Sequence, residues 1–226
     1  MPAPPAFLRI DFPRSMGYSG QNTQNGDDFL ESQRFSQQLT FLTQVDKMKN
    51  ILRQTLLADG SRRETDAEHS WHFALMAMVL YEYCALPHVD LNRVLKMALV
   101  HDLVEIYAGD TFCYDQAANE DKALREKESA DRLFALLPED QGVEYRKLWE
   151  EFDAMETSDA RYAAAIDRLQ PLINDLLTEG HTWKLGNVAA AQVYERMDPI
   201  RTAAPALWPF VEKSIKESVE KGYLRP

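Results

Sequence analysis

The sequence predicts an all-α fold, organised as a single-domain helical bundle. Apolar residues recur at three- and four-residue steps through most of the chain, which is the spacing of amphipathic helices. Only 9 of the 226 residues are glycine, too few for the many tight turns of an all-β fold. Hydrophobic residues make up 45% of the chain, which is ordinary for a globular protein with a buried core. We expect this domain to cover residues 28–226.

Residues 1–27 differ in composition from the rest of the chain. They are rich in Pro, Gly, Ser, Asn and Gln, which predicts a flexible N-terminal arm. They lack the basic start and apolar centre of a secretion signal. No stretch of the chain approaches the eighteen apolar residues of a membrane span, and two cysteines do not make a disulfide scaffold. We therefore expect a cytoplasmic protein that does not interact with membranes.

The first two helices follow from the apolar pattern. One stripe of apolar residues begins after Asp28 and continues to Leu52, which predicts a helix of roughly 25 residues or more. The turn residues around Gly60 end this stripe. A second helix is expected from Asp66 to about Ala85. Its stretch 73–80 is apolar on every side, as is usual for the central helix of a bundle.

The third helix begins after Asp90, a good N-cap, and is expected over Leu91 to about Ile106. Gly109 ends it, and a charged loop over 110–119 follows. Further helices are expected over about 120–137, 142–155, 158–179, 187–195 and 208–221.

The charge balance limits the possible partners. The chain carries 25 Lys and Arg against 36 Asp and Glu, a formal net charge of −11. Nucleic-acid binding needs an extended basic face, so we expect no nucleic-acid partner. A small phosphorylated substrate remains possible because it requires only a few local cations.

Polar residues interrupt the apolar helices at three places. His69 begins the second helix, His101 and Asp102 follow an apolar run in the third, and Asp167 interrupts a later one. Such groups are costly to bury unless they are satisfied, and together they can converge on one divalent metal ion. Imidazole and carboxylate ligands suit Mn, Fe, Co, Ni or Zn. Taken singly, each has an alternative interpretation as a helix cap or a salt-bridge partner.

The order of these four residues carries a resemblance to a known family. Together with the segments 63–72 and 98–110, the His…His-Asp…Asp pattern resembles the HD-domain metal-dependent phosphohydrolases, in the branch that includes the 5′-deoxynucleotidases. The resemblance covers about residues 35–200 and implies an HD-type bundle. It also implies that His69, His101, Asp102 and Asp167 bind the metal.

The same resemblance implies further roles at the site. Glu105 matches an acidic residue implicated in catalysis, and Asp110 matches a second one just beyond it. Arg53 stands roughly where an arginine holds the substrate phosphate, but a loop of variable length leaves Arg62 or Arg63 as alternatives. Gln54 replaces an aromatic residue that helps select the deoxyribose, which leaves the sugar preference open.

Elementary chemistry supports two of these roles independently. Glu105 is three residues after Asp102 and four after His101, so a continuous helix places all three on one face. Glu105 can then orient a water or move its proton, while the alternative role is a surface salt bridge. Because acidic residues surround the expected metal, a phosphate dianion needs arginines to hold it.

The expected function is therefore metal-dependent hydrolysis of (deoxy)nucleoside 5′-monophosphates by attack of metal-bound water. The first alternative is a nucleotide phosphodiesterase or pyrophosphohydrolase. The second is a non-catalytic, metal-containing helical scaffold or sensor. Because members of the family are often homodimers, the resemblance also implies a homodimer.

Overall fold

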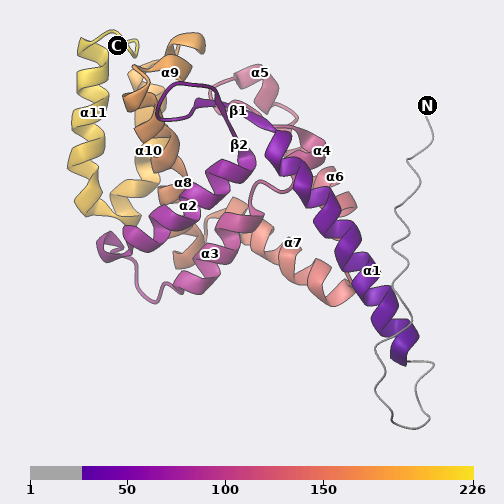
Figure 1. The fold of residues 1–226 in the computed structure, drawn as a ribbon. Helices are drawn as coiled ribbons and strands as arrows, with labels where there is room; N and C mark the ends of the chain where they lie inside the picture. Colours follow the sequence, from indigo (N-terminus) through magenta and orange to yellow (C-terminus); the bar gives the residue numbers. More distant parts are fainter. Residues whose placement is uncertain (1–26) are drawn as a thin grey trace.

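The computed structural model describes residues 27–226, with side chains described from residue 32 onward. It confirms the predicted all-α class, because helices form most of the described structure and the one sheet is small and two-stranded (Figure 1). The predicted flexible arm over 1–27 lies, except for its last residue, outside the described residues. The helices are α1 (Asp27–Val45), α2 (Asp66–Val79), α3 (Leu91–Val100), α4 (Glu105–Ala108), α5 (Gln116–Asn119), α6 (Lys122–Phe134), α7 (Glu139–Ala154), α8 (Ser158–Leu177), α9 (His181–Leu185), α10 (Ala190–Ala203) and α11 (Trp208–Glu220). Three short 3₁₀ helices are η1 (Asp46–Asn50), η2 (Tyr81–Tyr83) and η3 (Pro205–Leu207), and the strands are β1 (Leu52–Leu56) and β2 (Arg63–Thr65).

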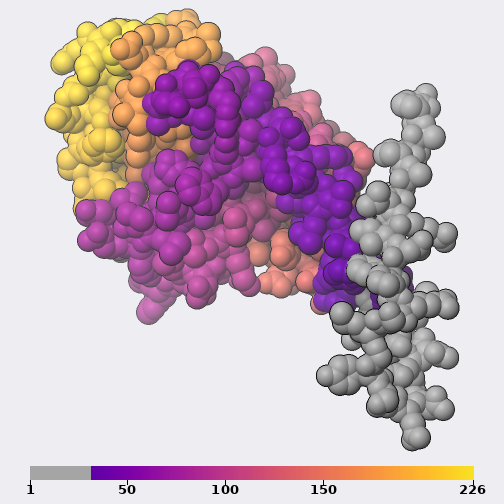
Figure 2. All heavy atoms as spheres, viewed as in Figure 1, coloured from indigo at the N-terminus to yellow at the C-terminus, as the bar shows by residue number. Residues whose placement is uncertain are grey.

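Helix α8 forms the centre of the bundle. It contacts α2, α3, α7 and α10, and its buried alanine run Ala163–Ala165 allows these neighbours to approach closely. Helices α10 and α11 pack together at one end of the molecule, coloured orange to yellow in Figures 1 and 2. At the other end α1 packs on α7, where Phe41 meets the edge of Tyr145 at a centroid distance of 5.9 Å. The hydrophobic core therefore lies around α8, between these two ends.

The first helix ends earlier than the apolar stripe predicts. Helix α1 stops at Val45, η1 follows, and Leu52 begins β1 instead of continuing the helix. The expected helix of 25 residues or more was therefore wrong beyond Val45. Tertiary pairing outweighs the local periodicity here, because residues 52–56 form an antiparallel ladder with β2.

Helix α2 begins with a capping box. The Thr65 side chain accepts a hydrogen bond from the Glu68 backbone N–H, and the Glu68 carboxylate accepts one from the Thr65 N–H. Phe73 and Ala77 are buried against the core. The outer face of α2 is not covered, however, and the expectation of a helix surrounded by protein was wrong. Its exposed apolar residues are Trp71, Leu75, Met78 and Val79.

The third predicted helix is interrupted. Helix α3 ends at Val100, and α4 begins only at Glu105. Between them the backbone makes i to i−3 hydrogen bonds, including Glu105 N–H to the Asp102 carbonyl at 2.9 Å. In such a tighter turn, side chains three residues apart lie one above the other. This geometry replaces the continuous helix expected from Leu91 to Ile106 and brings Asp102 and Glu105 together.

Within residues 27–226, none of the helices has the length and hydropathy needed to span a bilayer.

Candidate functional site

Three helical elements bring the four predicted metal-binding residues together. His69 comes from α2, His101 and Asp102 follow α3, and Asp167 comes from α8. Asp167 Oδ1 lies 2.9 Å from His69 Nε2 and 3.5 Å from His101 Nε2. Asp102 Oδ2 lies 3.1 Å from His101 Nε2 and 3.8 Å from His69 Nε2. Both imidazoles and Asp167 are buried, so the cluster is a group of polar side chains within the core.

Hydrogen bonds at the far side of each ring fix the imidazole orientations. His69 Nδ1 lies 2.9 Å from Gln170 Oε1, and His101 Nδ1 lies 3.0 Å from the Ala98 carbonyl. Both partners are acceptors, so we assign the proton of each ring to Nδ1. The Nε2 lone pairs then face the carboxylates of Asp102 and Asp167. Lone pairs and carboxylates facing one point form a stable arrangement when a cation or proton lies between them.

This donor set fits a divalent metal ion. His101 Nε2 is buried and has no hydrogen-bond partner in the described part of the chain. Burial by itself would lower the pKa of His101, but the charges of Asp102 and Asp167 outweigh it and raise this pKa to about 10. A site that attracts a proton so strongly also attracts a metal cation. Two imidazole nitrogens and two carboxylate oxygens suit the borderline first-row metals.

A second acidic group lies directly beside the first. Oxygen atoms of Asp66, Asp102 and Glu105 lie within 4.8 Å of one another. Both oxygens of Asp66 and Oε2 of Glu105 are buried without a hydrogen-bond partner in the described structure. Burial, followed by the charge of Asp102, raises the pKa of Asp66 to about 7 and that of Glu105 well above its ordinary value.

Arg53 is the cation that stabilises this acidic group. Its Nη1 donates to Asp102 Oδ2 at 2.8 Å and lies 3.6 Å from Asp66 Oδ1, while Nε lies 3.9 Å from Glu64 Oε2. Burial would lower the pKa of Arg53, but the surrounding carboxylates, Asp102 first, raise it above its ordinary value. Arg53 thus remains charged inside the protein, and only 14% of its side chain is exposed.

An irregularity in the pairing of β1 directs the Arg53 side chain into the site. Leu52 pairs with Thr65 and Leu56 with Arg63, so β1 contains two more residues than β2 between these pairs. Arg53, Gln54 and Thr55 consequently all line one cavity, which a regular strand with alternating side chains would not allow. The Arg63 guanidinium donates to the backbone carbonyls of Leu52 and Arg53 and so holds the irregular segment in place.

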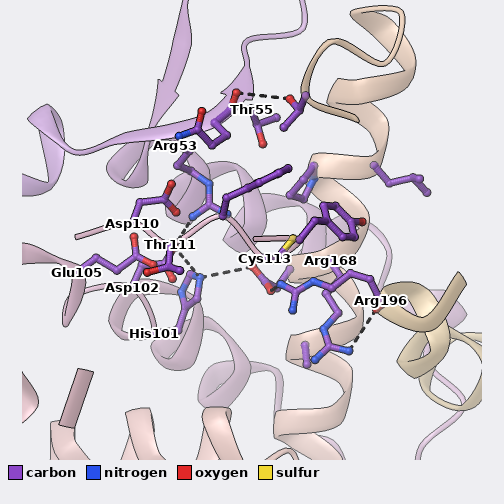
Figure 3. Close-up of a pocket in the computed structure, with 18 of the residues that line it drawn as sticks. Arg53, Thr55, His101, Asp102, Glu105, Asp110, Thr111, Cys113, Arg168 and Arg196 are labelled. Carbon is purple, nitrogen blue, oxygen red and sulfur yellow. Dashed lines mark hydrogen bonds and ion pairs between the residues drawn. The ribbon is translucent and has the colours of Figure 1, made fainter. Parts of the chain in front are cut away.

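The cavity next to the metal-binding cluster has a volume of about 170 Å³. Five predicted residues besides Arg53 line it: His101, Asp102, Glu105, Asp110 and Asp167. Figure 3 shows Glu105, Asp102 and Asp110 opposite Arg168 and Arg196. Burial raises the pKa of Asp110 above its ordinary value, while Arg53 opposes this.

Two of the predicted arginines do not line this cavity. Arg62 is exposed and forms an ion pair with Glu68, 2.5 Å from Nη2 to Oε1, beside Trp71 on the outer face of α2. Arg63 bonds the hairpin backbone, as described above. The cations that do line the cavity are Arg53, Lys122, Arg168 and Arg196.

Sequence reasoning missed several residues at the site. Gln170 links His69 to Glu64, since its Nε2 donates to Glu64 Oε1 at 2.7 Å. Gln170 is a polar residue on an apolar face, three positions after Asp167, so the signal that identified Asp167 also applied to it. Glu64 and Asp66 resembled the ordinary acidic start of a helix. Arg196, whose Nη2 lies 3.8 Å from Asp167 Oδ2, had no distinguishing pattern.

Asp175, which also lines the cavity, makes the stability depend on pH. Burial raises its folded pKa to about 7, although the Thr182 backbone N–H donates to its Oδ1 at 3.1 Å. The folded state thus holds this proton more tightly, and ionisation destabilises it as pH rises from about 4 to 7. We expect Asp175→Asn to gain stability relative to the natural protein, by about 2–3 kcal/mol more at pH 8 than at pH 5. Urea unfolding at both pH values measures this difference. An equal effect at pH 5 and pH 8 would contradict it, and the exposed Asp198→Asn is the control.

Comparisons with known proteins agree with this geometry. Residues 45–208 match the family model described as HD domain. Two curated relatives, the 5′-deoxynucleotidase HDDC2 of Bos taurus and of Homo sapiens, are each 30% identical over 136 residues, which is 60% of this chain. The chain covers 64% and 65% of the length of these two proteins, respectively.

Solved structures extend the similarity to most of the chain. A protein of Magnetospirillum magnetotacticum, described as a predicted metal-dependent phosphohydrolase, is 49% identical with a TM-score of 0.82, covering 87% of this chain and 98% of that one. A protein of Pyrococcus horikoshii shares the fold, at 22% identity and a TM-score of 0.53, covering 81% of this chain and 99% of that one. With the family model matched over residues 45–208, this chain belongs to the HD domain family.

Proposed function

We propose that this protein is a metal-dependent phosphohydrolase that removes the phosphate from (deoxy)nucleoside 5′-monophosphates. One observation carries the proposal: Nε2 of His69, Nε2 of His101 and Oδ1 of Asp167 face one point in the wall of a cavity that also contains a buried acid and several cations. The names of the HDDC2 relatives and of the Magnetospirillum protein support the reaction class.

His69, His101, Asp102 and Asp167 would hold one divalent ion. Such a cation, when bound, acidifies water and polarises a phosphoryl oxygen. Mn, Co, Fe, Ni and Zn are all compatible with two imidazoles and two carboxylates. Gln170 and the Ala98 carbonyl keep the two rings in the orientation that ligation requires.

We assign the proton transfers to Glu105 and Asp110. The pKa of each is raised, because Glu105 is buried and Asp110 is half-buried close to other carboxylates. Glu105 lies beside Asp102 and can take a proton from the attacking water. Asp110 lines the same cavity and can donate a proton to the leaving oxygen of the nucleoside. A scaffold with a purely structural metal has no need for these acids.

Arg53 would contact the substrate phosphate with the part of its guanidinium that Asp102 does not occupy. Its second role is to neutralise the buried carboxylates, so other cations must contribute to phosphate binding. Lys122 and Arg196 line the cavity and are suited to this. Arg62 and Arg63 instead receive structural roles, at the α2 N-terminus and in the hairpin.

We further propose that the protein is a homodimer in the cytoplasm. Trp71, Leu75, Met78 and Val79 are spaced along one face of α2, and between 43% and 65% of each is exposed. An isologous contact between two copies of α2 would cover this apolar face. Both cysteines, Cys84 and Cys113, are free thiols, which suits a reducing compartment.

A metal-exchange experiment with a substrate panel tests the function. The protein is stripped with a chelator, and phosphate release from 5′-mononucleotides with and without the 2′-hydroxyl is then measured before and after adding Mn²⁺ or Co²⁺. We expect release only after metal addition, and only from 5′-monophosphates. Equal release in the chelator, or no release from any nucleotide with any metal of the set, would refute the proposal.

A further inference from the structure

A second, larger cavity borders the one beside the metal-binding cluster. Its volume is about 700 Å³, and we call it the outer groove. It shares four lining residues with the inner cavity, which therefore form the boundary between the two: Gln54, Phe112, Tyr114 and Thr182. The two spaces therefore adjoin at these four residues.

The size of the inner cavity limits what it can hold. Pockets for small organic ligands usually measure about 300–1,000 Å³, so the inner cavity of about 170 Å³ is too small for a whole nucleotide. The outer groove falls within that range. A nucleoside monophosphate with its phosphate at Asp102 and Asp167 must therefore extend beyond the inner cavity.

The two spaces differ in charge. The inner cavity contains several acids and four cations, whereas Gln116, Asn187 and Gln192 give the outer groove neutral amide groups. The charged residues that line the groove already form hydrogen bonds within the protein. Asp115 Oδ1 accepts from the Ala118 N–H at 3.1 Å, and Arg225 Nε donates to the Asn187 carbonyl at 2.8 Å. The groove suits an uncharged group with many hydrogen-bonding positions.

Aromatic rings mark the boundary. Phe112 and Tyr114 pack edge to face, with centroids 5.4 Å apart and an angle of 77°. Gly186 makes this position of Phe112 possible, because a Cβ at residue 186 would lie only 2.5 Å from Phe112 Cε1. Rings held in this way provide a rigid apolar surface against a sugar or base.

We propose that the outer groove is the nucleoside subsite of the enzyme. The phosphate lies in the inner cavity, the sugar passes between Gln54, Tyr114 and Thr182, and the base lies against α5 and the segment that follows α9. This inference rests on the proposed function and extends it, since it assigns the recognition of the base to residues remote from the metal ligands.

Two substrates that differ only in the base test the subsite. Deoxyadenosine 5′-monophosphate and deoxyribose 5-phosphate carry the same phosphate and sugar. Ala117 lines the outer groove and is exposed, so Ala117→Phe should fill the groove without touching the inner cavity. We expect it to lower kcat/KM for the nucleotide about tenfold relative to the sugar phosphate, mainly through KM.

Glu120→Phe provides the matched control, because Glu120 is exposed just beyond α5 and lines neither cavity. The control should leave the ratio of the two substrates unchanged. Binding of deoxyadenosine, measured by calorimetric titration, should weaken in Ala117→Phe and not in Glu120→Phe. If Ala117→Phe leaves both the ratio and nucleoside binding unchanged while wild type hydrolyses the nucleotide, the subsite is wrong and the function stands. If wild type hydrolyses neither compound with any metal, both proposals fall.

Discussion

Replacing Asp167 by asparagine is expected to lower the proposed nucleotidase activity at least about 1000-fold, which corresponds to ~4 kcal/mol of transition-state stabilisation. The Asp167 Oδ1 atom lies within 3.5 Å of both imidazole Nε2 atoms, so it is the point where α2, α3 and α8 meet. An amide keeps the shape of this side chain but removes its charge. The metal content of the purified variant and its kcat/KM for a deoxynucleoside 5′-monophosphate measure the effect.

Asp153→Asn is the matched control for this change. Asp153 lines the same cavity but is exposed and is not part of the metal-binding cluster. The same loss of charge there should change the activity by only about threefold or less. Retention of both metal and activity in Asp167→Asn would refute the assignment of Asp167 as a metal ligand.

Replacing Arg53 by methionine is expected to destabilise the metal-free protein by about 3–5 kcal/mol. Three carboxylates, those of Glu64, Asp66 and Asp102, lie within 3.9 Å of the guanidinium, and Glu64 and Asp66 are almost fully buried. Without Arg53 these groups would be left without a cation, which is far more costly than the loss of a surface ion pair. Urea unfolding of the chelator-treated protein, without substrate, measures the effect.

Arg62→Met is the comparison for this second change. Arg62 also forms an ion pair with a glutamate, but the pair is exposed on the surface of α2, so a much smaller loss of stability is expected. If Arg53→Met instead unfolds with the same midpoint as the natural protein, then Arg53 serves the substrate alone, and its role in neutralising the buried carboxylates is wrong.

The fold class and the grouping of the metal-binding residues followed from local patterns. Polar residues in apolar helices singled out His69, His101, Asp102 and Asp167, and the resemblance to the HD-domain family implied that they bind one metal ion. The same criterion, a polar residue on an apolar helix face, also selects Gln170. Periodicity alone did not reveal β1, since Leu52 continues a helical pattern while its backbone pairs with Thr65.

Other features depended on tertiary structure in a way that local sequence does not encode. The interruption after Val100 sets the position of Glu105, and it is visible only in the backbone hydrogen bonds. Arg196 reaches the site because α10 packs on α8, a contact between segments far apart in the sequence. Arg62 and Arg63 are close to His69 in sequence, but sequence proximity did not place them in the site. Arg62 lies beside Glu68 on the surface of α2, and Arg63 bonds the hairpin backbone.

The irregular pairing of β1 determines which length changes the chain can accommodate. The loop between Leu56 and Arg63 lies at the surface and can gain or lose a residue while the ladder keeps its pairing. A single deletion between Leu52 and Leu56 would shorten the irregular segment and turn Arg53 away from the carboxylates. Homologous chains should therefore vary in length between Leu56 and Arg63 and keep a fixed spacing between Leu52 and Leu56.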